Sequence, residues 1–184
     1  MKSLTSILES TPIIPAVRES KFIKALSSPC EVIFLLGVNI LSVADCIRAA
    51  HEKGELLFIH IDLSDGIGKD EAGVKYLSSL GCDGIITTRA QIIKYAKREG
   101  LYTVQRFFTL DSQGLESISD MLSTTSPDTI EIMPGVITKT VKHFVETGIP
   151  VIAGGLVETK EEVTNALSAG AVCVSTGKED LWYL

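Results

Sequence analysis

Residues 150–177 read PVIAGGLVETKEEVTNALSAGAVCVSTG, and this stretch decides the fold. It opens with a short apolar run, Pro150–Gly154, typical of a strand that is buried on both faces. Thr159 and Glu162 follow at the spacing of a capping box, in which each residue satisfies an N–H group at the start of a helix. The stretch therefore predicts a strand, a loop and a helix.

A second strand is predicted directly after this helix. Gly170 is the residue type that commonly ends a helix in the left-handed conformation, and the apolar run Ala171–Ser175 comes next. Two strands joined by a crossover helix lie parallel in one sheet. We therefore expect a βαβ unit.

The same unit repeats along the whole chain, because apolar runs with strand character begin about every 23 residues. Eight runs are expected to be strands: Ile13–Arg18, Val32–Gly37, Leu56–Leu63, Gly84–Thr87, Tyr102–Phe108, Thr129–Met133, Pro150–Gly154 and Ala171–Ser175. Eight parallel repeats predict an α/β fold, a single (β/α)8 TIM-type barrel that spans residues 1–184 as one domain.

The chain after the last expected strand is short. Residues 176–184 leave room for about two turns of helix, which predicts a barrel with a short or missing final helix. Leu181 and Trp182 are expected to cover the seam between the first and last strands. We favour packing on their own barrel, and the alternative is a homo-oligomer formed through this seam.

Composition excludes several classes of protein. Seventeen Lys and Arg against twenty-three Asp and Glu give a formal net charge of −6, which excludes a globally basic nucleic-acid binder but not a local basic patch. The apolar runs are too short for a bilayer, and residues 1–12 lack the apolar stretch of a secretory signal. The four scattered cysteines lack metal-ligand spacing. We expect a cytoplasmic protein with reduced thiols, no metal and no membrane contact.

Glycine-rich loops follow the last two expected strands. In this fold the strand C-termini form the working face, and the loops after strands seven and eight often bind a phosphate. Glycine lets the main chain approach a ligand, and amides at a helix start favour an anion. We predict a phosphate held by Gly154, Gly155, Ser175, Thr176 and Gly177, with a simple tight turn as the alternative.

Strand alternation places charged side chains inside the barrel. Arg18, Asp62 and Glu131 are expected to point inward, and so must one of the adjacent Gln105 and Arg106. An isolated buried charge costs several kcal/mol, so these groups need partners. We expect Arg18, Asp62, Arg106 and Glu131 to neutralise one another and to contact the polar part of a ligand, with a purely structural ion network as the alternative.

Two further polar residues have assigned positions in the predicted barrel. His60 is expected deeper in the barrel, as a hydrogen-bonded core residue and not a base. Lys69 lies in the loop 64–70, which we predict to act as a lid over the ligand, although Gly66 and Gly68 also suit a plain turn.

Several catalytic signatures are missing from the sequence. No strand carries a lysine placed to form a Schiff base, and there is no nucleophile elbow. Asp62 and Glu131 remain a candidate acid–base pair. The residues nevertheless describe a receptor for a phosphorylated ligand more clearly than a catalyst.

Several stretches resemble the glycerol-3-phosphate-responsive antiterminator family. They are Ile13–Arg18, His60–Leu63 with Gly66, Gly84–Arg89, Gln105–Ser112, Pro127–Gly135 and Ile152–Gly155, within a similarity that runs from about Ile13 to Trp182. The resemblance implies a cytoplasmic regulator of glycerol-uptake genes, not an enzyme, without a cofactor. It implies that glycerol 3-phosphate is the effector and that leader mRNA is the partner on which transcription antitermination occurs.

The negative net charge requires any RNA surface to be local. Lys94, Lys97 and Arg98 form a small basic patch on one expected helix, and the helix with Lys139, Lys142 and His143 is the alternative. The alternative function is a TIM-barrel enzyme for a small phosphorylated substrate: a glycerophosphodiester hydrolase, an isomerase or an aldolase. The first strand ends without a histidine, which argues against the hydrolase.

Overall fold

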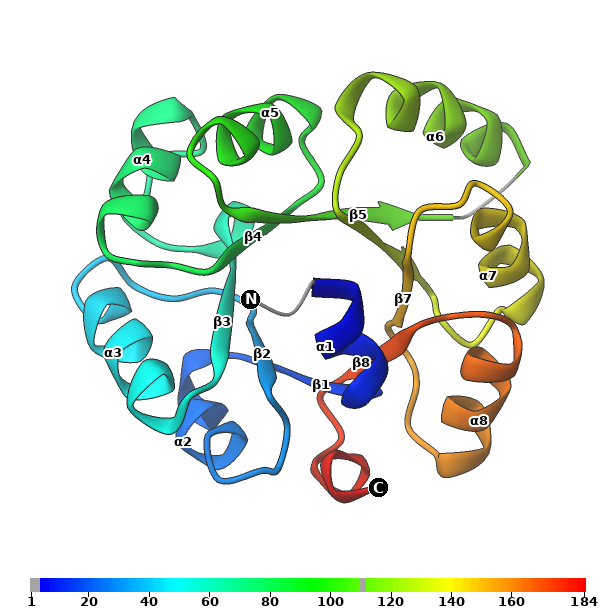
Figure 1. The fold of residues 1–184 in the computed structure, drawn as a ribbon, viewed down its shortest axis with the longest axis horizontal. Coiled ribbons are helices and arrows are strands. Elements are labelled where there is room, and N and C mark those ends of the chain that lie inside the picture. Colours follow the sequence, from blue (N-terminus) through cyan, green and yellow to red (C-terminus); the bar gives the residue numbers. More distant parts are fainter. Residues whose placement is uncertain (1–3, 110–111) are drawn as a thin grey trace.

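In the computed structural model, parallel strands close into a barrel with helices packed around it (Figure 1). The structure describes residues 4–109 and 112–184, without the side chains of residues 112–117 and 119. The strands are β1 (Ile13–Val17), β2 (Val32–Leu35), β3 (Leu56–His60), β4 (Gly84–Thr87), β5 (Tyr102–Phe108), β6 (Thr129–Met133), β7 (Val151–Gly154) and β8 (Cys173–Thr176). Each pairs with the next, and β1 pairs with β8, so the predicted (β/α)8 barrel is confirmed.

Helices separate successive strands and cover the outside of the barrel. They are α2 (Phe22–Ala25), α3 (Val43–Lys53), α4 (Glu71–Ser79), α5 (Ala90–Arg98), α6 (Ser112–Thr125), α7 (Thr138–Val145) and α8 (Lys160–Ser168). Short 3-10 helices are η1 (Glu19–Lys21), η2 (Ile61–Leu63) and η3 (Glu179–Tyr183). The capping box predicted at Thr159 and Glu162 is present at the start of α8. In the described part of the chain, none of the helices has the length and apolar character needed to cross a bilayer.

Strand alternation produces two separate cores. Ile14, Phe34 and Phe58 belong to a cluster inside the barrel, whereas Ile130 and Ile132 pack between the sheet and the helices. Residues of opposite parity therefore face opposite sides, as a pleated strand requires. The interior is filled with side chains, as is usual for this fold.

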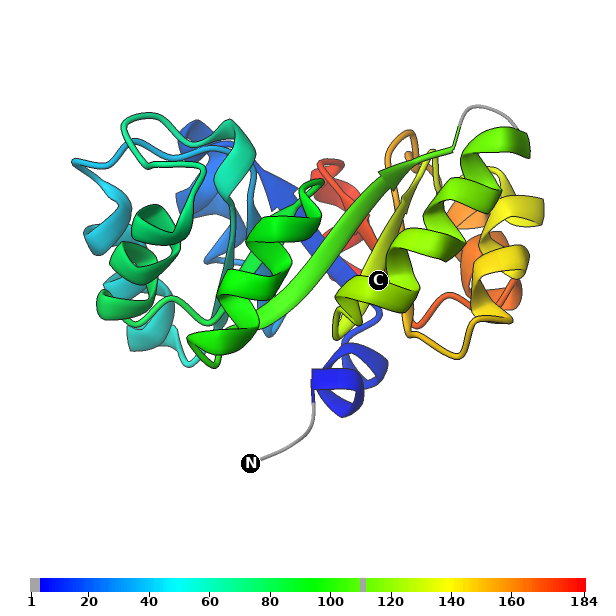
Figure 2. The same cartoon turned by 90° about the horizontal axis from the view of Figure 1, so that it is seen from above.

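An N-terminal helix that the sequence reasoning did not anticipate, α1 (Leu4–Ser10), lies across the end of the barrel where the strands begin (Figure 2). Leu4 and Leu8 are buried in the interior cluster, with Ile7 packed against it. Their i, i+3, i+4 spacing was the signal available in the sequence. The strand C-termini consequently form the open end of the barrel.

The short tail covers its own barrel. Leu181 and Trp182 on η3 are 5% and 2% exposed. The Trp182 indole Nε1 donates to the Thr176 carbonyl at 3.0 Å, and the Cys30 thiol lies 3.5 Å from the Trp182 carbonyl. The seam is thus filled from within the chain, in agreement with the reading favoured from sequence, and these two side chains are withdrawn from any interface.

Candidate ligand-binding site

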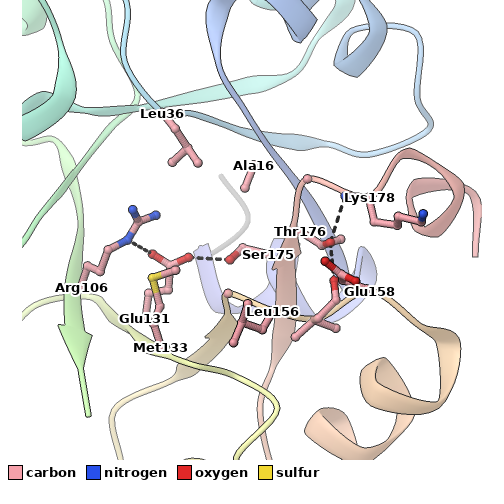
Figure 3. Close-up of a pocket in the computed structure, with 13 residues that line it drawn as sticks. Ala16, Leu36, Arg106, Glu131, Met133, Leu156, Glu158, Ser175, Thr176 and Lys178 are labelled. Carbon is pink, nitrogen blue, oxygen red and sulfur yellow. Dashed lines mark hydrogen bonds and ion pairs between the residues drawn. The ribbon is translucent and has the colours of Figure 1, made fainter. Parts of the chain in front are cut away.

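A pocket of about 280 Å³ lies at the end of the barrel where the strands finish (Figure 3). Its walls come from β1, β5, β6, the segment after β2 and the loops after β7 and β8. The lining residues are Ala16, Leu36, Arg106, Glu131, Met133, Gly155, Leu156, Val157, Glu158, Ser175, Thr176, Gly177 and Lys178. This volume is near the lower end for small-molecule sites, so the pocket suits a compact ligand.

A chain of polar contacts forms the inner wall of this pocket. Arg106 Nε donates to Glu131 Oε2 at 2.6 Å, and the Ser175 hydroxyl donates to Glu131 Oε1 at 2.5 Å (Figure 3). Arg106 and Glu131 are direct register partners on β5 and β6, which brings the two side chains to one level of the barrel. Because all three residues are at most 6% exposed, the ion pair is held in a largely water-free environment.

The pair leaves part of Arg106 available. Only Nε is used by Glu131, and among the described residues the two terminal guanidinium nitrogens have no hydrogen-bond partner. Figure 3 shows that end of the side chain directed toward Leu36 and the open part of the pocket. A guanidinium group has five donors in a fixed fork, so Arg106 can still donate to a ligand oxygen.

The loops after β7 and β8 form the outer wall. Gly155 and Leu156 both have positive φ angles, 75° and 60°, a conformation that turns successive amides and is easiest for glycine. Among the described residues, the N–H groups of Gly155, Leu156 and Gly177 have no main-chain partner. Thr176 Oγ1 donates to the Val157 carbonyl at 2.7 Å, which ties the two loops together. Free amides of this kind suit a phosphate oxygen.

Four of the five residues predicted to hold a phosphate line the pocket, and Gly154 does not. A Cβ at Gly154 would stand 2.5 Å from Glu131 Oε1 and 2.6 Å from Ser175 Oγ. The glycine therefore provides the space in which Glu131 and Ser175 meet.

Leu36, Met133, Glu158 and Lys178 also line the pocket and were not predicted to do so. Strand alternation was the available signal for Leu36 and Met133, which have the parity of the inward residues Phe34 and Glu131. It says nothing about Glu158 and Lys178, which lie in loops beyond the strand ends.

The expected four-member charge network does not form around Arg106 and Glu131. Asp62 lies in η2, because β3 ends at His60 and strand alternation no longer applies beyond it. Its carboxylate accepts from the Thr88 amide at 2.8 Å and lies 3.4 Å from Arg89 Nε. The Thr88 hydroxyl also donates a hydrogen bond to the Asp62 carboxylate.

Arg18 is the other residue that differs from this expectation. It follows the last residue of β1, is exposed, and has no ion-pair partner among the described residues. Beyond the end of the strand, its side chain is no longer constrained to the barrel axis.

His60 is the inward residue at the end of β3, 3% exposed and in electrostatic contact with Arg106 and Glu131. Among the described residues, its Nδ1 has no hydrogen-bond partner, so the expectation of a hydrogen-bonded core histidine is not met at this nitrogen. Burial first, and the Arg106 charge second, lower the pKa of His60 to about 4. The imidazole is thus neutral at physiological pH.

The lowered pKa of His60 predicts acid sensitivity. Between about pH 6.5 and pH 4, His60 becomes protonated in the unfolded chain but stays neutral in the folded chain. The folded state is therefore less stable in this range than above pH 6.5. Between pH 7 and pH 4, we expect the free energy of unfolding of His60→Leu to fall by about 2 to 3 kcal/mol less than that of the wild type, as measured by urea unfolding. The exposed His143→Gln on α7 is the control. Parallel stability curves for His60→Leu and wild type would contradict this account.

Lys69 does not reach the pocket. Its ammonium donates to the carbonyls of Ser64 and Ile67, the latter at 3.0 Å, within its own loop. The loop packs closely on α4, since a Cβ at Gly73 would lie 1.8 Å from the Gly68 carbonyl oxygen. Loop 64–70 is therefore held against α4 in this structure and does not cover the pocket.

The predicted basic patch is exposed on α5 but partly engaged. Lys97 donates to the Ser126 carbonyl, and Arg98 lies 3.9 Å from Glu71 and 4.9 Å from the centre of the Tyr95 ring. Lys94 has no ion-pair partner among the described residues. The patch keeps its positive charge near the surface, away from the pocket.

The groups that line the pocket suit the binding of a compact phosphorylated ligand. None of the eight strands carries a lysine. Among the described residues, no group of three or more His, Cys, Asp or Glu side chains is arranged to hold a metal. The walls offer free amides, one guanidinium fork, a buried carboxylate that is already bonded on both oxygens, and the exposed charged residues Glu158 and Lys178.

A family model and two of the similar solved structures name antiterminator proteins. The sequence model described as glycerol-3-phosphate responsive antiterminator matches residues 13–182. The uncharacterized protein YgcP of Escherichia coli (strain K12) is 34% identical over 184 residues, which cover 98% of this chain and 96% of that protein. Of the family stretches noted in the sequence, Leu110 and Asp111 lie outside the described residues.

Two crystal structures are similar over nearly their whole length. The glycerol uptake operon antiterminator regulatory protein from Listeria monocytogenes is 33% identical with a TM-score of 0.88, covering 92% of this chain and 94% of that one. A glycerol uptake operon antiterminator-related protein from Thermotoga maritima is 31% identical with a TM-score of 0.84, covering 94% and 98%. The chain therefore belongs to the glycerol-3-phosphate responsive antiterminator family.

Proposed function

We propose that this chain is a cytoplasmic regulator that binds glycerol 3-phosphate in the pocket described above and acts on leader mRNA to promote transcription antitermination. Family membership supports the regulatory role. The observation that supports this ligand is the pocket itself. At one side are the amides after β7 and β8, which have no main-chain partner among the described residues, and at the other side is the Arg106 fork.

The ligand is oriented by these two walls. The phosphate lies against the loops after β7 and β8, where the amides of Gly155 and Gly177 provide donors. The glycerol end then points toward Arg106, which donates to a hydroxyl oxygen. Leu36 and Met133 contact the carbon chain.

Coupling to RNA requires a segment whose state depends on the ligand. Loop 64–70 does not line the pocket, so we assign this part to residues 176–178, which do. Glycerol 3-phosphate favours an RNA-competent state only if it binds that state more tightly than the other. By linkage, leader RNA must then raise the affinity for the ligand by the same factor.

Calorimetry tests this proposal. Glycerol 3-phosphate is expected to bind the purified chain, glycerol not to bind, and leader RNA to raise the affinity for glycerol 3-phosphate. Equal affinity with and without RNA would remove the coupling. Turnover of triose phosphates or glycerol phosphodiesters by the same preparation would favour the enzymatic alternative.

The RNA surface has its own test. Reversing the charges of Lys94, Lys97 and Arg98 together to glutamate is expected to weaken leader-RNA binding at least about ten-fold and to flatten its salt dependence, because fewer counterions are released. The matched control is Lys139→Glu with Lys142→Glu on α7. A gel shift unchanged in the first variant and lost in the second would place the surface on α7.

A further inference from the structure

The inner wall of the pocket carries two opposite charges that cancel. Arg106 is positive and 6% exposed, and Glu131 is fully buried 2.6 Å from it. The Ser175 hydroxyl is neutral and already donates to Glu131. The far end of the pocket therefore has donors and acceptors but no net charge.

This arrangement suits a hydroxyl group better than a carboxylate. A hydroxyl accepts from the terminal nitrogens of Arg106 and can donate to a remaining lone pair of Glu131. A carboxylate in the same place gains the attraction of Arg106 but also meets the repulsion of Glu131, whose Oε2 lies 2.6 Å from Arg106 Nε. The carboxylate also loses its hydration shell when it enters the pocket. The paired charges of Arg106 and Glu131 leave too little net attraction to offset this desolvation cost.

We propose that Glu131 sets the charge selectivity of this site. It admits a phosphate monoester whose far end is a neutral polyol and rejects one whose far end is a carboxylate. Glu131 thus acts through Arg106, holding the guanidinium in place and neutralising it. This inference rests on the proposed binding of glycerol 3-phosphate and adds the discrimination between that ligand and phosphorylated hydroxy acids.

Glu131→Gln is a suitable probe because the amide can keep both contacts. The glutamine oxygen accepts from Arg106 Nε, and its NH₂ group donates to the Ser175 hydroxyl oxygen. The substitution removes the negative charge and leaves Arg106 uncompensated. An incoming carboxylate then takes the place of Glu131 as the partner of Arg106.

The experiment compares glycerol 3-phosphate with 3-phosphoglycerate by calorimetry. The wild type is expected to prefer the polyol at least about 100-fold, and Glu131→Gln to reduce this ratio to below about ten-fold or to reverse it. Glu146→Gln, which makes the same charge change at an exposed site on α7's end, is expected to keep the wild-type ratio.

Each result has a separate meaning. If the wild type binds neither ligand, the proposed function fails. If the wild type binds both ligands with affinities within ten-fold of each other, the ligand site stands and the selectivity proposal is overturned. This result does not depend on whether any variant folds. A folded Glu131→Gln that retains the wild-type ratio also overturns it.

Discussion

Replacing Arg106 with methionine is expected to lower the free energy of unfolding by about 3 to 5 kcal/mol and to abolish binding of glycerol 3-phosphate. The methionine fills much of the same space, so the loss comes from Glu131, which remains fully buried without its counter-charge. Ser175 alone cannot neutralise it, since a hydroxyl donates one hydrogen bond and carries no charge. Urea unfolding and calorimetry on one preparation measure both effects.

A double variant separates the two losses. Arg106→Met combined with Glu131→Leu removes both charges, and replacing a buried pair by apolar residues is often neutral or stabilising. We expect the double variant to recover stability to within about 1 kcal/mol of the wild type while binding no ligand. If Arg106→Met alone costs less than about 1 kcal/mol, the pair does not exist as described here.

Replacing Trp182 with alanine is expected to cost about 3 to 5 kcal/mol of folding free energy. The indole is 2% exposed in the seam between β1 and β8, so its removal leaves a large cavity that the short tail cannot close. Tyr183→Ala is the matched control, because Tyr183 is the next residue on η3 and is 62% exposed. Its effect is expected to stay within about 0.5 kcal/mol.

The same tail is expected to influence the ligand. Trp182 donates to the carbonyl of Thr176, a residue of the pocket. Trp182→Phe keeps most of the packing but loses this hydrogen bond, worth about 1 kcal/mol. We expect a folded Trp182→Phe with weaker glycerol 3-phosphate binding; unchanged affinity would show that the tail supports only the fold.

The barrel was predictable because its strands are buried on both faces and recur at regular spacing. The capping box at Thr159 and the inward position of Glu131 followed from local rules of helix capping and strand pleating. Which of Gln105 and Arg106 points into the barrel could be decided only from the register of β5 against its neighbouring strands. The register of β5 turns Arg106 inward, while Gln105 contacts Met121 and Thr125 of α6.

The remaining misplacements lie where regular structure ends. Asp62 falls within a predicted strand, but the chain turns into a 3-10 helix at Ile61, and Arg18 lies beyond the last residue of β1. The sequence predicts that Gly154 contacts the phosphate, because it shows that this position lacks a side chain but not which neighbour needs the space. Strand termini and close approaches depend on tertiary packing, which periodicity does not encode.

The helix α1 has a kinetic consequence for any molecule that binds in the pocket. This helix closes the end of the barrel where the strands begin, and bulky side chains such as Phe34 and Phe58 fill the interior behind the pocket. Ligand exchange must therefore pass through a single opening, at the strand C-termini. A macromolecule bound over that opening would lengthen the residence time of the ligand without adding a contact to it, and association and dissociation would slow together.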